Sequence, residues 1–233
     1  MDVADPASRR AAGAAAREVM GGATPLAALV NNAGVALDLP WSPPPPPGGT
    51  GEVAERTLAT NFVGAVALTR ELLEVSLLQR GSRVVSVSSG GGHIAIHRVL
   101  PEVKARFLAP DLSTDGVLEA ARGFVADAAR GGKDALQEKW GYSHCYGFSK
   151  LCLTTACRTM AREHPELVVH GCTPGFIQTG MTTGSAATGT PDEGAEIVAY
   201  LVLSGDEAVL ESGKFWNPQR EVLAWDDERY VAK

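Results

Sequence analysis

The residues best suited to chemistry in this chain of 233 residues begin with Tyr146 and Lys150, in the run Tyr-Gly-Phe-Ser-Lys. Residues four apart lie on one face of a helix, so a helix over this stretch brings the phenol and the ammonium together. A cation near a phenol stabilises the phenolate and lowers its pKa, so the phenol can give a proton to an oxygen near neutral pH. Alone, the spacing is a weak signal, because a surface tyrosine beside a lysine has the same pattern.

Three further polar clusters each follow a short apolar run that has the character of a buried parallel strand. The pairs of strand and cluster are 26–30 with 31–34, 83–87 with 88–92, and 167–171 with 173–179. Ligands bind outside the carboxyl ends of the strands in open α/β sheets. The fold would bring all three clusters to that rim, and their convergence predicts a functional site there.

Helices and strands alternate along the chain, and they must position these residues. Helices are expected from Asp5 to about Met20, from Glu52 to Leu78, from Tyr146 to about Glu163 and after Pro191, with a weak fourth strand over 213–216. This alternation favours one α/β domain over residues 1–233, with a parallel sheet covered on both faces.

Two segments interrupt this alternation. Residues 93–143 form an insert, and one amphipathic helical pattern lies inside it. The five prolines of 43–47 exclude helix and central strand, so we expect a stiff, exposed polyproline loop. A ligand for a proline-recognising domain is the minor alternative for that loop.

Composition narrows the classes of partner. The 21 basic and 27 acidic residues give a net charge of −6, so no nucleic-acid partner is predicted. No apolar run approaches the roughly 20 residues of a membrane span, and no signal peptide is visible. Four cysteines without a C-x-x-C pair indicate reduced thiols of a cytoplasmic protein. The five histidines form no H-E-x-x-H motif, so no metal site is expected.

Taken together, these motifs resemble the short-chain dehydrogenase/reductase family. The matching residues, in the family's order, are Asn31-Asn32-Ala33-Gly34, Asn61, Ser89, Tyr146 with Lys150, and Pro174-Gly175 with Thr179. The resemblance extends from Asp2 to about Trp225. Within the family, the 56 residues between Ser89 and Tyr146 are similar to the insert of the monomeric, NADPH-dependent carbonyl reductases.

The resemblance implies a Rossmann-like, doubly wound parallel sheet that reduces a small carbonyl compound by hydride transfer from NADPH. Tyr146 would protonate the developing alkoxide, and Ser89 would hold the same oxygen. Lys150 would bind the nicotinamide ribose and lower the pKa of Tyr146, and Asn61 would anchor a water in the proton relay. The insert implies a monomer, because in those reductases it covers the face that other family members use to dimerise.

The resemblance also assigns residues to the cofactor. Asn31, Ala33 and Gly34 would lie beside its adenosine half and brace the sheet, and Asp2 would neighbour the adenine. Pro174, Gly175 and Thr179 would cover the nicotinamide. The glycines at 90–92 supply no side chains, which suggests a roomy substrate pocket.

The family opens with a strand, a glycine-rich turn written T-G-x-x-x-G-x-G and a helix, which together bind the pyrophosphate. Nothing of that kind precedes Asn31. We therefore expect an N-terminally truncated domain, a fragment or incomplete gene model, in which the strand 26–30 is an exposed edge. The alternative is a degenerate, non-catalytic interaction protein that binds a partner through this edge and the proline loop.

Overall fold

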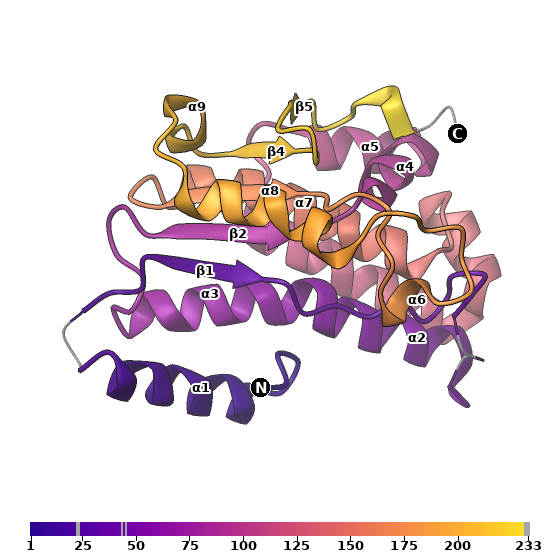
Figure 1. The fold of residues 1–233 in the computed structure, drawn as a ribbon. Coiled ribbons are helices and arrows are strands. Elements are labelled where there is room, and N and C mark those ends of the chain that lie inside the picture. Colours follow the sequence, from indigo (N-terminus) through magenta and orange to yellow (C-terminus); the bar gives the residue numbers. More distant parts are fainter. Residues whose placement is uncertain (22–23, 43, 45, 231–233) are drawn as a thin grey trace.

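The computed structural model describes residues 1–21, 24–42, 44 and 46–230. Its centre is a five-stranded sheet in the order β1-β2-β3-β4-β5 (Figure 1). The first four strands run parallel, and β5 pairs antiparallel to β4. The strands are β1 Ala28–Asn31, β2 Arg83–Val87, β3 Val168–Cys172, β4 Lys214–Trp216 and β5 Val222–Leu223. The four predicted strands are confirmed, and β5 is too short for its periodicity to show in the sequence.

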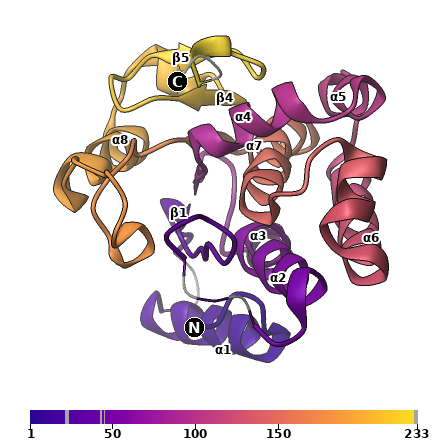
Figure 2. The same ribbon diagram turned by 90° about the vertical axis from the view of Figure 1, so that its right-hand side faces the viewer.

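Helices cover the two faces of the sheet unequally (Figure 2). One face carries α2 Gly49–Leu58, α3 Gly64–Glu74 and α7 Cys145–Glu163, with α4 Gly90–Arg98, α5 Pro101–Leu108 and α6 Thr114–Trp140 packed around α7. The other face carries α8 Pro191–Leu203, with the short α9 Glu207–Leu210 beyond it. α1 Pro6–Val19 lies beside α3 rather than on the sheet. The larger apolar core is therefore on the α7 face, and a smaller one lies under α8.

Local signals set several helix starts. The Asp5 carboxylate accepts hydrogen bonds from the main chain of Ala7 and Ser8, and Pro6 occupies the first helical position, as predicted. α8 begins in the same way, with Pro191 at its first position and a capping box between Thr190 and Glu193.

The helix predicted from Glu52 to Leu78 differs from the structure in two respects. It ends at Glu74, and a π-helical turn over Ala59–Val63 divides it into α2 and α3. Asn61 is the central residue of this turn and is fully buried. π-Turns of this kind frequently mark functional sites.

The insert holds three helices, whereas the sequence predicts one. Pro101 starts α5 and the Ser113 side chain caps α6, so each begins with an ordinary local signal. α4 starts earlier than the insert was expected to, because Ser89 caps it and the glycines at 90–92 form its first turn. These glycines were expected to be loop, because their helix propensity is low.

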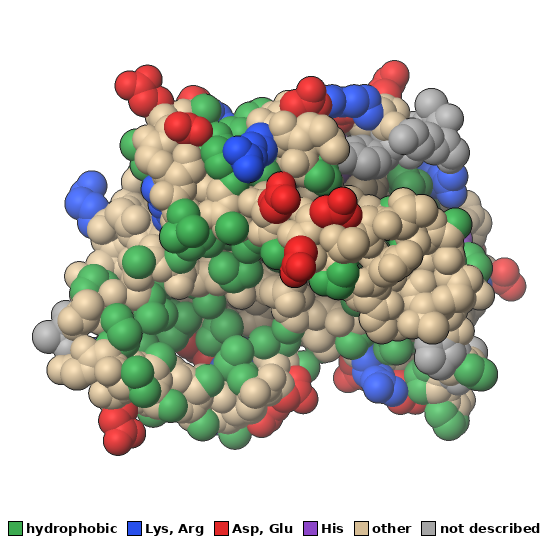
Figure 3. Space-filling view, in the orientation of Figure 1, with side chains coloured by type: hydrophobic (Ala, Val, Ile, Leu, Met, Phe, Trp, Pro, Cys, Tyr) green, Lys and Arg blue, Asp and Glu red, His purple; other side chains and the backbone are tan. Residues whose placement is uncertain are grey.

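β1 forms one edge of the sheet and pairs only with β2 in the part of the chain that the structure describes. Val30 of β1 pairs with Val85 of β2, which belongs to the core under α8. Val30 itself is not covered by α8 and is 39% exposed. Hydrophobic side chains gather over this region of the surface (Figure 3). The predicted exposed apolar edge is confirmed. Within the proline run, Pro43 and Pro45 lie outside the described residues.

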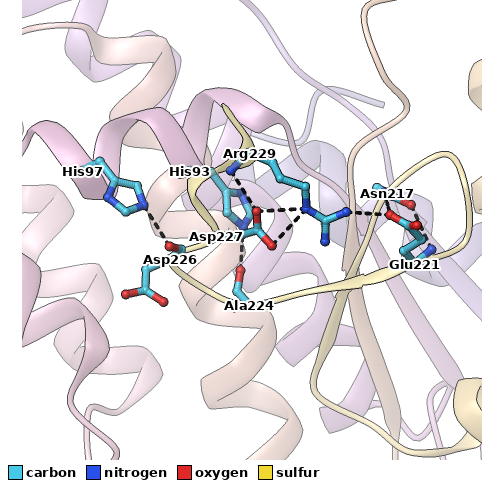
Figure 4. A network of polar contacts seen from close by, with 8 residues as sticks. All are labelled: His93, His97, Asn217, Glu221, Ala224, Asp226, Asp227 and Arg229. Atoms are coloured by element: carbon cyan, nitrogen blue, oxygen red, sulfur yellow. Dashed lines mark hydrogen bonds and ion pairs between the residues drawn. The ribbon is translucent and has the colours of Figure 1, made fainter. Parts of the chain in front are cut away.

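The edge of the sheet opposite β1 is formed by residues 217–229, here called the C-terminal strap, which include β5 (Figure 4). His93 and His97 on α4 hydrogen-bond through Nε2 to the strap carbonyls of Ala224 and Asp226, at 3.0 and 2.9 Å. Arg229 forms ion pairs within the strap, at 3.1 Å to Asp227 and 2.6 Å to Glu221. The strap thus holds α4, the helix that begins directly after Ser89.

Candidate active site

A cavity of about 760 Å³ opens where β1, β2 and β3 end. Its lining includes Asn32–Gly34 after β1, Val87–Ser89 at the end of β2, and Pro174–Ile177 with Thr179 after β3. Tyr146 and Lys150 of α7 line it as well. The three polar clusters and the Tyr-Lys pair therefore meet at one site, as the sequence predicts.

Tyr146 and Ser89 form the centre of the site. Tyr146 is the second residue of α7 and Ser89 caps α4, and both side chains lie beside Gly91, where an added Cβ would be 3.5 Å from Ser89 Oγ. The tyrosine ring also packs on Gly91, where an added Cβ would lie 3.4 Å from Cε1. Burial raises the pKa of Tyr146, and the hydrogen bond from Ser89 lowers it. The phenol is therefore protonated at neutral pH and has a donor beside its oxygen.

Lys150 lies one turn further along α7, with its Nζ 5.8 Å from the centre of the Tyr146 ring. The buried Nζ donates a hydrogen bond to the carbonyl of Val87 at 2.8 Å, and burial lowers the pKa of Lys150 to about 8. The expectation that Lys150 holds the pKa of Tyr146 below its ordinary value is wrong for this structure. Desolvation of the buried phenol is the largest influence on its pKa, and Ser89 offsets it only in part.

Asn61 joins the loop after β1 to α7. Its Oδ1 accepts from the main-chain N–H of Val35 at 2.7 Å, and its Nδ2 donates to the Val35 carbonyl at 2.8 Å and to Ser149 Oγ at 2.9 Å. The side chain thus braces the loop against α7. Its proposed part in a water relay stays a prediction. Gly34 sits beside it, and a Cβ there would lie 3.4 Å from Asn61 Oδ1 and 3.7 Å from Lys150 Nζ.

The residues assigned to the cofactor divide into two groups. Ala33, Gly34, Pro174, Gly175 and Thr179 line the cavity. Asn31 does not: its amide donates to Thr69 and Ser86 behind the sheet, so it braces β1 as expected but does not face the cavity. Asp2 is exposed and accepts a hydrogen bond from Ala4, also away from the cavity.

Two contributors were not identified from the sequence. The Trp41 ring lies 5.7 Å from that of Phe176, and its Nε1 donates to the Met181 carbonyl at 3.0 Å. This contact ties the loop after β1 to the loop after β3 at the cavity. Asp38, from the same first loop, reaches the start of α7 through its carboxylate. Both residues lie in non-periodic loops, and their contacts are more than 100 positions away in sequence, so no local pattern signals them.

Tyr142 lines the cavity as well. It is buried, and burial raises its pKa to about 12. Its hydroxyl lies against Gly147, where an added Cβ would come within 2.2 Å of the oxygen. A glycine at that position lets Tyr142 approach the backbone of α7 one residue after Tyr146.

Comparisons with known proteins place the chain. The family described as short chain dehydrogenase matches residues 1–101. Human carbonyl reductase [NADPH] 1 is 33% identical over 227 residues, which cover 94% of this chain and 76% of the relative. Salutaridine reductase from Papaver somniferum has a similar structure, with a TM-score of 0.74 at 25% identity, covering 92% of this chain and 80% of that one.

The NADPH-bound carbonyl reductase from chicken fatty liver shares the fold, with a TM-score of 0.61 at 22% identity over 97% of this chain and 75% of that one. Among the described residues, no helix has the length and apolar character needed to cross a membrane. The motifs, the sheet and the relative that is one-third identical over almost the whole sequence agree: the chain belongs to the short-chain dehydrogenase family.

Proposed function

We propose that the cavity reduces a small carbonyl compound by hydride transfer from NADPH, with Tyr146 as the general acid. The observation that carries this proposal is that Tyr146 and Ser89 lie together beside Gly91 inside the cavity, with Lys150 one helical turn away. NADPH and carbonyl substrates are the chemistry that the names of the relatives state.

The chain's own residues supply the proton chemistry. The nicotinamide, when bound, supplies the hydride. The Tyr146 hydroxyl gives its proton to the substrate oxygen as negative charge develops there, and Ser89 donates a hydrogen bond to the same oxygen. Because burial keeps Tyr146 protonated, the acid is ready before the reaction begins. The positive charge of Lys150 favours the phenolate that remains afterwards.

The nicotinamide end of the cofactor fits the residues present. Lys150 spends one of its three N–H donors on Val87, which leaves two for ribose hydroxyls. Gly34 keeps the space beside Asn61 and Lys150 free of a side chain. Thr179, at the start of a 3₁₀ turn, also lines the cavity. The described residues hold no glycine-rich turn after a strand that would receive the pyrophosphate.

The cavity walls favour an apolar, aromatic substrate such as a quinone or an aromatic aldehyde. Leu39, Pro40, Trp41, Ile94 and Phe176 supply apolar surface, and no acidic residue lines the cavity within the described part of the chain. The glycines at 90–92 contribute less room than expected. Gly91 alone of them lines the cavity, and Gly92 is buried against α7, where a Cβ would lie 2.9 Å from the main chain of Lys150.

We further propose a monomer with reduced thiols in the cytoplasm. α6, which belongs to the insert, packs on α2 and α7 and covers part of their outer surface. All four cysteines are free and buried. Light scattering at micromolar concentration should give a mass near 24.4 kDa, and a stable dimer would contradict the assignment.

The decisive test is turnover by Tyr146→Phe. NADPH oxidation with a quinone or an aromatic aldehyde should be measured at millimolar NADPH, on the chain itself and on a form extended by a strand, glycine-rich turn and helix. Loss of a general acid lowers the rate by about 10²- to 10⁴-fold. Cofactor affinity should not change, because the phenol gives its proton only as hydride arrives.

Turnover by Tyr146→Phe above about a tenth of that of the unaltered protein, when chemistry limits the rate, would remove Tyr146 from the role of acid. If neither form of the unaltered protein reduces any carbonyl, the result favours the non-catalytic interaction protein instead.

A further inference from the structure

The loop after β1 is fixed to the start of the catalytic helix by one carboxylate. Asp38 Oδ2 accepts from the main-chain N–H of Cys145 at 2.5 Å, and Oδ1 accepts from that of Tyr146 at 3.1 Å. The two amides are the first two of α7, whose opening N–H groups have no partner within the helix. Asp38 therefore caps a helix that begins 107 residues later in the chain.

α7 has no cap of its own to do this. His144 is in the capping position but makes no side-chain hydrogen bond to the helix, and the first turn has no acidic residue. Elsewhere in the molecule, α1, α6 and α8 begin with a local cap at Asp5, Ser113 and Thr190. In α7 the tertiary contact with Asp38 takes the place of such a local cap, whereas in α6 a tertiary contact, from Glu163 to the N–H of Thr114, adds to one.

The same loop is tied to α7 at a second place. Val35 is bonded through both main-chain groups to Asn61, and Asn61 donates to Ser149 Oγ. Ser149 Oγ in turn donates to the carbonyl of Tyr146 at 2.7 Å. The loop therefore holds both main-chain groups of Tyr146. Asp38 accepts from its N–H directly, and Val35 is linked to its carbonyl through Asn61 and Ser149.

The loop also forms substrate-facing wall. Leu39 and Pro40, directly after Asp38, line both the reaction cavity and a second cavity of about 400 Å³ behind the loop. In the described part of the chain, the two carboxylate contacts are the hydrogen bonds that join residues 37–40 to α7. The second cavity gives the loop space to shift if the carboxylate contacts are removed.

We propose that Asp38 is a positioning residue, which sets Tyr146 against Ser89 and fixes the adjacent substrate wall by capping α7 from a distant loop. The part of this inference that concerns catalysis rests on the proposed function. The placement of Tyr146 does not rest on it, so the two are tested separately.

Asp5 provides a matched control, because its carboxylate makes the same kind of double cap on α1, at 3.1 Å to Ala7 and 2.9 Å to Ser8. α1 lines neither of the cavities described above and carries none of the reacting groups. Asp5→Ala and Asp38→Ala should each speed the hydrogen exchange of the two helix N–H groups that the carboxylate caps. Only Asp38→Ala should disturb the site.

The first measurement needs no cofactor. In NMR spectra of the chain, the Tyr146 ring should show a nuclear Overhauser contact to Gly91, on which it packs. Asp38→Ala should weaken that contact and expose the amides of Cys145 and Tyr146 to exchange. Asp38→Asn keeps one acceptor oxygen and should restore the ring contact in part, and Asp5→Ala should leave it unchanged.

The second measurement is kinetic, on the form that turns over. A displacement of about 1 Å costs up to roughly 100-fold in rate, so Asp38→Ala should lower kcat by about 10- to 100-fold with NADPH affinity unchanged. An unchanged ring contact in Asp38→Ala, or an equal loss in Asp5→Ala, would overturn the positioning role. If Asp38→Ala does not fold, an unchanged ring contact and unchanged amide exchange in Asp38→Asn would overturn it equally. An altered ring contact with no turnover in any form would sink the proposed function and leave the placement of Tyr146 by Asp38 standing.

Discussion

The two ends of the cavity are built differently. At the reaction end, Ser89, Tyr146 and Lys150 stand at the starts of α4 and α7, which pack directly on each other, and the C-terminal strap supports α4 from outside. At the cofactor end, Gly175, Phe176 and Thr179 are exposed residues of a loop. This loop follows β3, and β1, two strands away, has one unpaired edge in the described part of the chain.

This difference separates two tasks. Proton transfer needs a few groups held in fixed positions. The buried N-terminal turns of α4 and α7 hold such groups in place without a bound ligand. Holding a dinucleotide needs a long surface with main-chain donors for the pyrophosphate, and that surface depends on what pairs with β1. The chain has the first and, in its described residues, lacks the second.

The largest expected effect concerns cofactor affinity. NADPH should bind this chain with a Kd in the millimolar range, about 4 kcal/mol weaker than micromolar binding, because the reaction end alone cannot grip the pyrophosphate. Isothermal titration on the chain and on the form extended by a strand, glycine-rich turn and helix measures the difference. Micromolar or tighter binding by the chain alone would mean that the two ends are not separate in this way.

The same substitution at both ends should differ in its effect on stability. Gly92→Ala puts a Cβ 2.9 Å from the main chain of Lys150, where α4 crosses α7, and should destabilise the fold by about 1–3 kcal/mol while separating Ser89 from Tyr146. Gly180→Ala meets nothing within 4 Å and should change stability by less than about 0.5 kcal/mol. Urea denaturation of both variants is the measurement, and equal midpoints would contradict the contrast.

The buried ammonium at the reaction end should destabilise the fold in a pH-dependent way. The pKa of Lys150 falls from 10.5 to about 8 on folding, so the unfolded chain binds more protons between these values and stability rises with pH there. Lys150→Met removes this penalty, and after the loss of one hydrogen bond it should stabilise the chain by about 2 kcal/mol at pH 7.

That gain should shrink as the pH rises above about 8, reach zero near about pH 9.5 and become a small loss by about pH 10.5, because only the lost hydrogen bond then remains; urea titrations at several pH values would show this. Lys139→Met, at an exposed lysine, is the control and should show neither the gain nor its pH dependence. A gain that stays constant with pH would show that Lys150 is not responsible through its charge.

The smallest expected effect on stability is at the edge strand. Val30 is 39% exposed, so Val30→Lys should change the free energy of unfolding by less than about 0.5 kcal/mol. The same change should suppress concentration-dependent self-association, because a charge on an open edge opposes pairing with another chain. Dynamic light scattering over a range of concentrations checks this. If Val30→Lys self-associates as much as the unaltered chain, β1 is not the edge through which the chains pair.

The sequence by itself determined the elements with local causes. Asp5 and Pro6 start α1, apolar runs define β1 to β4, and the Tyr146-Lys150 spacing puts two groups on one helix face. The convergence of the three polar clusters also followed from the sequence, because carboxyl ends of parallel strands share one rim.

Only the tertiary structure decided how those groups are held and tuned. Capping of α7 by Asp38, bracing by Asn61 through a π-helical turn, and closure by the C-terminal strap all join residues far apart in the chain. The pKa of Tyr146 reversed its predicted direction for the same reason. A spacing of four residues fixes which side chains are neighbours, but the free energy of charging them depends on how deeply the whole fold buries them.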